Sequence, residues 1–169
     1  MRAPFRVVAI TGASSGLGAL LAAAYAGPQV VLGLIGRNRD RLASVAAACA
    51  ASGAVVCSET IDVADGPAMA EWLTAFDREY PVELVVANAG ISDGIGGKGA
   101  YEPGDVTTRQ IAVNLLGTVH TIAPLLPPLC ARRRGQIALI ASVAGLRGLP
   151  YSGPMAKRCG RCWNRRGSG

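Results

Sequence analysis

The sequence has no run of 18 or more apolar residues, although half of its 169 residues are hydrophobic. A helix needs about 20 such residues to cross a bilayer, so the chain is predicted to have no membrane span and no membrane partner. A secretory leader is the alternative interpretation of the N-terminus. The glycines and serines of residues 11–18 interrupt its apolar segment, and the default expectation is therefore a cytoplasmic protein.

Few metal-binding side chains are present. His120 is the only histidine, and Cys159 and Cys162 form a single C-x-x-C pair with no second pair. A structural zinc site needs four ligands, mostly cysteine or histidine, so the sequence predicts no metal site. The remaining cysteines lie among apolar residues and are expected to be small core residues: Cys49, Cys57 and Cys130.

Acidic residues are absent from the last 13 positions, which carry five basic residues. The net charge of +6 therefore belongs largely to this end of the chain, and the rest is nearly neutral. Together with Trp163, these basic residues are a candidate contact for nucleic acid through phosphate neutralisation and stacking. Because residues 153–169 show neither helical nor strand periodicity, we expect a disordered basic tail without a nucleic-acid partner, and a folded domain over residues 1–152.

Apolar segments alternate with helix-forming ones along the rest of the chain. Strands are expected at 5–10, 29–35, 54–61, 82–87 and 135–141, and helices at 17–26, 40–52, 65–79 and 105–126, the last broken near Pro124. The strands are nearly continuous apolar runs, as in a parallel sheet covered on both faces. The pattern predicts an α/β protein with a Rossmann-like, doubly wound parallel sheet of about five strands.

The segment TGASSGLG joins the first predicted strand to the first predicted helix. Such a turn lies at the carboxyl end of a parallel sheet, where α/β proteins bind ligands. Gly12 permits a tight turn, Gly16 lets a phosphate approach the backbone, and Gly18 lets the helix pack closely on the strand. Ser14 and Ser15 add hydroxyl donors, and the helix N-terminus favours a pyrophosphate. A tight strand–helix turn without a ligand is the alternative interpretation.

Five motifs in order resemble the short-chain dehydrogenase/reductase family over about residues 5–152. The glycine loop has the spacing G-x-x-x-G-x-G rather than the commoner G-x-G-x-x-G. The other four are Asp62-Val63 after the third strand, Asn88-Ala89-Gly90 after the fourth, Asn114 in a helix and Ser142 after the fifth. Alone, each has an ordinary explanation as a helix cap, a turn or a helix residue bonded to the backbone, but the five in register favour the family.

The resemblance implies an NAD(P)-dependent oxidoreductase that acts on a small-molecule carbonyl or secondary alcohol, and a homo-oligomer for the intact family fold. It implies that Asp62 and Val63 hold the adenine, that Ser142 orients the substrate oxygen, and that Asn114 supports a proton-relay water. The cofactor-binding residues that it implies are Gly12, Ser14, Ser15, Gly16, Leu17, Gly18, Arg37, Asp62, Val63, Asn88, Ala89 and Gly90.

The end of the second predicted strand bears on the choice of cofactor. A NAD-dependent enzyme places a carboxylate there for the 2′-hydroxyl of the adenosine, whereas here Gly36 occupies that position and Arg37 follows. An arginine can bind a 2′-phosphate through paired hydrogen bonds, so the sequence favours NADP(H) over NAD(H). A solvated Arg37 is the alternative, and the nearest acid, Asp40, is expected to cap the following helix.

A tyrosine and a lysine four residues apart complete the family's site, the tyrosine as general acid or base. The matching positions hold Met155 and Cys159, while Tyr151 and Lys157 lie six residues apart and are not predicted to share a helix face. Losing a general acid typically costs about 10²–10⁴ in rate. We therefore expect an oxidoreductase of the family or, alternatively, a catalytically defective nucleotide-binding remnant. A frameshift after about residue 153 would account for the loss of the family pattern.

Overall fold

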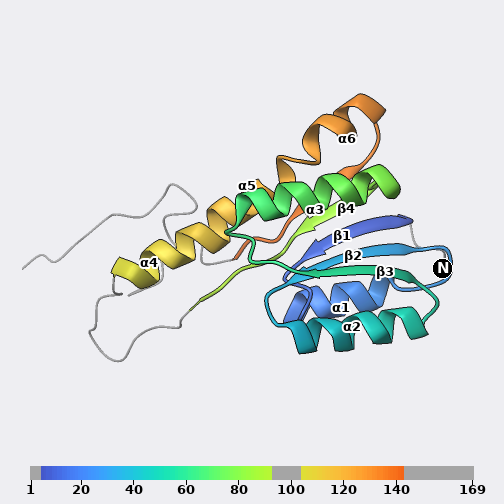
Figure 1. Cartoon of the computed structure of the whole chain (residues 1–169), viewed down its shortest axis with the longest axis horizontal. Helices are drawn as coiled ribbons and strands as arrows, with labels where there is room; N and C mark the ends of the chain where they lie inside the picture. The colour runs from blue at the N-terminus through green and yellow to red at the C-terminus, as the bar shows by residue number, and fades with distance from the viewer. Residues whose placement is uncertain (1–4, 93–103, 143–169) are drawn as a thin grey trace, which may run out of the picture.

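The computed structural model describes residues 5–92 and 104–142, and Figure 1 shows their arrangement. The strands are β1 (Val7–Thr11), β2 (Val31–Gly36), β3 (Val55–Thr60), β4 (Leu84–Ala87) and β5 (Gln136–Leu139). The helices are α1 (Gly16–Tyr25), α2 (Arg39–Ala51), α3 (Gly66–Glu79), α4 (Gly104–Ile111), η1 (Ala112–Leu116), α5 (Gly117–Ile122) and α6 (Leu126–Arg132). The prediction of a basic tail at residues 153–169 lies outside the described residues.

The five strands form one parallel sheet in the order β3-β2-β1-β4-β5. β1 lies at its centre, where Val8 is opposite both Leu32 of β2 and Leu84 of β4. The prediction of a Rossmann-like, doubly wound sheet is confirmed, and the five strands begin and end within two residues of the predicted ranges. The carboxyl ends of β1, β2 and β4 therefore meet at one edge of the sheet.

Helices cover both faces of the sheet. α1 and α2 lie against one face, and α3 and α5 lie against the other (Figure 1). Successive side chains of a strand point to opposite faces, so Val8 and Ile10 pack in the core on the side of α1 and α2, whereas Ala9 packs on the side of α3. This burial on both sides is the physical reason that the strands are apolar at nearly every position.

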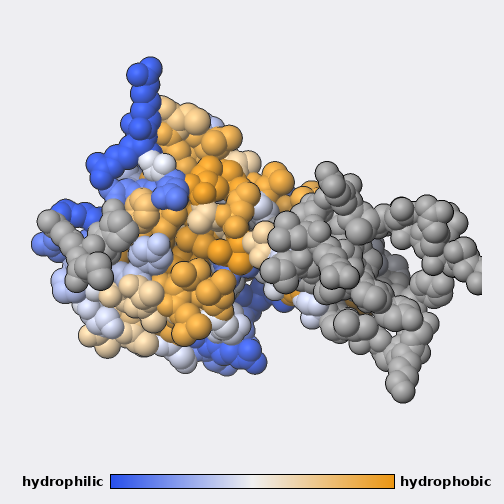
Figure 2. Space-filling view, turned by 180° about the vertical axis from the view of Figure 1, so that it is seen from behind, coloured by the Kyte–Doolittle hydropathy of each residue, from blue (hydrophilic) through white to orange (hydrophobic). Residues whose placement is uncertain are grey.

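The helical stretch from α4 to α6 is not uniform. η1 is a π-helix of five residues, and a turn at residues 123–125 separates α5 from α6, which confirms the predicted break near Pro124. By length and composition this stretch is apolar enough to cross a membrane, a test that core helices also pass. Part of it packs on the sheet through Val113, Leu125 and Leu129, while other apolar residues are exposed. Figure 2 shows a broad apolar surface on the side opposite the view of Figure 1.

The predicted cap of α2 is wrong. The N-cap is Asn38, whose Oδ1 accepts a hydrogen bond from the Arg41 amide at 2.9 Å. The helix begins at Arg39, one residue before the predicted start, and Asp40 therefore lies in its first turn. There the carboxylate is favoured by the positive end of the helix dipole rather than by capping bonds.

The three cysteines predicted to lie in the core differ in burial. Cys49 on α2 is buried as predicted, and burial raises the pKa of its thiol. Cys57 is only half-buried because β3 is an edge strand, and burial together with the nearby Glu79 raises the pKa of its thiol. The prediction for Cys130 is wrong, because this side chain lies on an exposed part of α6.

An ion pair joins α3 to α6 and to the segment before β4. The two terminal nitrogens of Arg132 donate hydrogen bonds to the Asp77 carboxylate at 2.8 and 2.7 Å, and Nη2 also donates to the Val82 carbonyl at 3.2 Å. The Val82 amide donates to Asp77 Oδ1 at 2.9 Å. Burial of the Asp77 carboxyl opposes its ionisation, but the bonds from Arg132 and Val82 outweigh burial and hold its pKa below the usual value.

We expect Arg132→Met to lower the free energy of unfolding by about 2–4 kcal/mol at pH 7, because it leaves the carboxylate of Asp77, 8% exposed, without its partner. The folded-state pKa of Asp77 is depressed, so its contribution is complete above the ordinary carboxyl pKa and is lost as the pH falls through the lower folded-state value. The difference in unfolding free energy between the variant and the wild type should therefore shrink below about pH 4. Urea unfolding of both proteins at pH 7 and at pH 3 measures this change.

Arg134→Met is the matched control for this substitution. Arg134 pairs with Glu83 at 2.8 Å, but its own side chain is 77% exposed. Glu83 is 17% exposed, but its other oxygen still accepts a hydrogen bond from the Arg6 amide at 2.7 Å, and the Arg134 guanidinium lies in solvent, so this variant should lose less than about 1 kcal/mol. Equal destabilisation by the two substitutions would contradict the special role of the pair between Arg132 and Asp77.

Candidate cofactor site

A cavity of about 400 Å³ opens where the carboxyl ends of β1, β2 and β4 meet. This is the edge at which open α/β sheets bind ligands, and the volume is typical of a small-molecule site. The lining residues are Gly12, Ser14, Ser15, Gly16, Leu17, Gly36, Arg37, Asn38, Arg41, Ile61, Val63, Asn88, Ala89, Gly90, Ile91 and Val113. The cavity brings together every predicted cofactor residue except Gly18 and Asp62.

Two glycines of the loop between β1 and α1 adopt the left-handed backbone conformation, with φ of +68° at Gly12 and +53° at Gly16. A Cβ at Gly12 would lie 2.8 Å from the Ala89 Cα, whereas a Cβ at Gly16 would meet nothing within 4 Å. α1 begins at Gly16, and its N-cap Ser15 makes no side-chain capping bond to the first turn. Open space beside uncapped helix amides is an arrangement that favours a phosphate group.

Asn88 is not an ordinary turn residue, because it ties the end of β4 to the glycine loop. Its Nδ2 donates to the Thr11 carbonyl at 3.0 Å and to the Gly12 carbonyl at 3.4 Å. Gly18 lies behind the loop, where a Cβ would overlap the Gly12 carbonyl and approach Asn88 Nδ2 to 2.7 Å. Gly18 therefore acts through close packing of α1 on the loop, and the cavity itself does not include it.

Asn114 is a buried residue of η1, and its side-chain amide makes two hydrogen bonds to the backbone of Ile91. Its Oδ1 accepts a hydrogen bond from the Ile91 amide at 2.7 Å, and its Nδ2 donates to the Ile91 carbonyl at 2.9 Å. A Cβ at Gly90 would lie 3.2 Å from Asn114 Oδ1, so the glycine lets the two segments approach closely. In this structure the two bonds from Asn114 hold the chain after β4, and Gly90 and Ile91 of that segment line the cavity.

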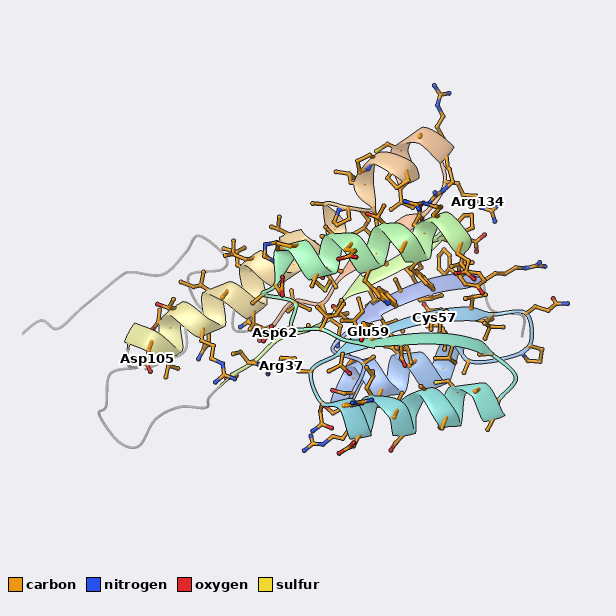
Figure 3. The ribbon with its side chains drawn as sticks, in the orientation of Figure 1. Arg37, Cys57, Glu59, Asp62, Asp105 and Arg134 are labelled. Atoms are coloured by element: carbon orange, nitrogen blue, oxygen red, sulfur yellow. The ribbon has the colours of Figure 1, made fainter. Side chains whose placement is uncertain are left out.

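The charged side of the cavity holds two arginines. Arg37 and Arg41 both line it, and Arg37 Nη1 lies 3.6 Å from a carboxylate oxygen of Asp62. Figure 3 shows Arg37 and Asp62 at the same end of the sheet. Asp62 Oδ1 also accepts a hydrogen bond from the Ala64 amide at 3.0 Å, which holds the carboxylate in the loop after β3. Arg41 was not predicted from the sequence; it lies in the first turn of α2, four residues after Arg37, which precedes the helix.

The position where a carboxylate would favour NAD is sterically restricted. Gly36 is buried at the end of β2, and a Cβ there would lie 3.0 Å from Ser14 Cβ and 3.1 Å from its Oγ. A larger residue at this position would force Ser14 and the glycine loop to shift. Ser14 of the glycine loop thus packs against the backbone at Gly36, where any other residue would place its Cβ.

Ser142 follows β5 on an exposed part of the chain and does not line the cavity. Tyr151 and Lys157 lie outside the described residues. Within residues 5–92 and 104–142, no three histidine, cysteine, aspartate or glutamate side chains gather closely enough to hold a metal ion.

Comparison with known proteins gives consistent matches. A model described as short chain dehydrogenase matches residues 6–154. A protein described as an uncharacterised oxidoreductase, from Myxococcus xanthus, is 34% identical over 146 residues, which cover 86% of this chain and 57% of the relative. Dehydrogenase/reductase SDR family member 7B of Bos taurus is 36% identical over 163 residues, which cover 89% of this chain and 49% of the relative. The chain thus spans about half the length of these curated relatives.

A solved structure with the same fold is that of a metagenomic short-chain oxidoreductase in complex with NADP. It superposes with a TM-score of 0.83 at 27% sequence identity, and the match covers 92% of this chain and 71% of the chain in that structure. The five-stranded sheet and its helices are therefore shared with a dinucleotide-binding protein.

We expect Gly12→Ala and Gly16→Ala to differ in their effect on stability. Both place a side chain at a positive φ, which costs about 1–2 kcal/mol. At Gly12 the methyl group also collides with the backbone of Ala89, so the total loss of unfolding free energy should exceed about 2 kcal/mol. Urea unfolding without ligand measures the difference, and equal losses at the two positions would contradict it.

Proposed function

The chain belongs to the short chain dehydrogenase family, and we propose that it binds NADP(H) in the cavity described above and serves as an oxidoreductase for a small-molecule carbonyl or secondary alcohol. The observation that carries the proposal is the open backbone at Gly16, beside the uncapped start of α1. A pyrophosphate can approach the amides there, because no side chain fills the space.

The remaining lining residues fit the other parts of a dinucleotide. The hydroxyls of Ser14 and Ser15 are donors beside the proposed phosphate position. Ile61 and Val63 give an apolar wall on the adenine side, and Asn114 supports the segment after β4 on the other side. When bound, the cofactor supplies the hydride that a carbonyl carbon accepts. The chain itself binds the dinucleotide and holds it in one orientation.

The preference for NADP(H) is proposed from the charges and the packing of this chain, since solved structures of the fold hold either dinucleotide. Arg37 and Arg41 bring two guanidinium groups to the cavity against the single carboxylate of Asp62. A 2′-phosphate adds negative charge that guanidinium groups bind well. A Cβ at Gly36 would crowd Ser14, so the carboxylate side chain that would favour NAD is disfavoured there.

We expect the wild type to bind NADPH more tightly than NADH. Arg37→Gln combined with Arg41→Gln should lower the affinity for NADPH about tenfold and leave the affinity for NADH unchanged. The expected loss corresponds to charge-assisted hydrogen bonds at an exposed site. Isothermal titration calorimetry with both cofactors measures it. Arg39→Gln is the matched control, because Arg39 lies on the same turn but does not line the cavity. Equal affinities of the wild type for the two cofactors would contradict the proposed preference.

A second candidate function is cofactor binding without turnover. It is favoured by the sequence, in which Met155 and Cys159 stand where the family's tyrosine and lysine are expected. The described cavity contains binding groups, and Ser142 is separate from it. The two candidates therefore share the cofactor and differ in whether a carbonyl is reduced.

Oxidation of NADPH in the presence of a panel of aldehydes, ketones and diketones separates the two candidates. For the oxidoreductase, we expect turnover that Ser142→Ala lowers about a hundredfold, since a donor to the substrate oxygen is lost. The affinity for NADPH should stay within twofold of the wild type, because Ser142 does not line the cavity. Tight binding of NADPH with no oxidation across the panel would instead favour the second candidate.

A further inference from the structure

The segment between β3 and α3 is the apolar wall of the cavity. Ile61 and Val63 line it, and Val63 is buried, with 4% of its surface exposed. Asp62 lies between them and faces Arg37. A shift of this segment would therefore move both the apolar wall and the carboxylate of Asp62.

His120 on α5 holds the backbone of this segment from behind. Its Nδ1 lies 2.9 Å from the Val63 carbonyl oxygen. A carbonyl only accepts hydrogen bonds, so Nδ1 carries the proton and donates it. The other side of the ring packs against Gly66 at the start of α3, where a Cβ would come within 2.9 Å of Nε2. The ring therefore fills the space between α5 and α3 and satisfies a carbonyl at the wall.

The backbone of α5 at Gly117 packs closely against the side chain of Val63. A Cβ at Gly117 would lie 2.5 Å from Val63 Cγ2 and 3.0 Å from Val63 Cβ. Gly117 and His120 are three residues apart and lie on one face of α5. One turn of this helix thus contacts Val63 at both its side chain and its carbonyl.

We propose that His120 is a positioning residue for the adenosine half of the dinucleotide, acting through Val63. The inference rests on the proposed cofactor function and deepens it. By binding the Val63 carbonyl, His120 keeps the apolar side chains of Ile61 and Val63 toward the cavity and keeps Asp62 opposite Arg37. A flat aromatic base requires such a fixed apolar wall. Without the bond, the Val63 carbonyl loses its side-chain partner and the segment can turn.

The test compares His120→Leu with His120→Asn in titrations with 2′,5′-ADP, which carries only the adenosine half of the cofactor. We expect the leucine variant to bind about fivefold more weakly than the wild type, because no donor reaches the Val63 carbonyl. The asparagine variant should bind within twofold of the wild type, since its Nδ2 can take the place of the histidine Nδ1. A leucine variant that binds like the wild type would overturn the proposal.

A control separates positioning from general stability. Thr121 lies beside His120, is buried, and donates from Oγ1 to the Gly117 carbonyl at 2.7 Å. Thr121→Val should lower the melting temperature and leave the affinity for 2′,5′-ADP unchanged. If Thr121→Val lowered the affinity for 2′,5′-ADP as much as His120→Leu does, at a similar melting temperature, the loss would reflect general destabilisation and the proposal would be wrong.

A second variant keeps the test decisive if His120→Leu does not fold. Gly117→Ala places a methyl group against Val63, and we expect this variant also to bind 2′,5′-ADP about fivefold more weakly than the wild type. Wild-type affinity in Gly117→Ala would overturn the proposal independently. A wild-type protein that bound neither 2′,5′-ADP nor NADPH would refute the proposed cofactor function itself.

Discussion

The hydroxyl of Thr11 is the constraint on which the shape of the cavity depends. It donates to the Val86 carbonyl at 3.4 Å and accepts hydrogen bonds from the amides of Asn88 and Ala89, both at 3.2 Å. A hydroxyl has one donor and two acceptor positions, so all of its capacity is used. Because Thr11 is buried, an alternative arrangement would leave polar groups unsatisfied. The ends of β1 and β4 therefore meet in one geometry.

This junction explains why the glycines of the loop are not equivalent. The Asn88 side chain and the Ala89 backbone fill the space beside Gly12, and the Gly12 carbonyl and the Asn88 side chain fill the space beside Gly18, so neither position has room for a side chain. Gly16 lies between these two in the sequence, but nothing is within 4 Å of a Cβ built there. Gly12 and Gly18 thus serve the junction, and Gly16 leaves room for a ligand. One short motif combines a structural requirement with a binding requirement.

Sequence patterns predicted the sheet, the cavity edge and most of its lining, because strand periodicity and turn glycines are local signals. They did not predict Asn38 as the cap of α2, since Asp40 is an equally common cap residue two positions later, or Arg41 as a lining residue, since a helix start does not show which side chains reach a cavity. The bond between Asn114 and Ile91 also could not be predicted, because it joins residues 23 apart through a π-helix. Nor could the pairing of Asp77 with Arg132, since sequence alone does not tell which distant charges meet.

Binding and catalysis depend on different constraints in this fold. The cavity is built on the junction at Thr11 and on the packing of α5 against the wall at Val63. Ser142 instead follows β5, an edge strand paired to β4 alone among the described strands. The chain reaches β5 from α6, whose last residue, Arg132, is held by Asp77. The pair between Arg132 and Asp77 therefore lies on the path of the chain to Ser142, whereas the junction at Thr11 lies at the centre of the sheet.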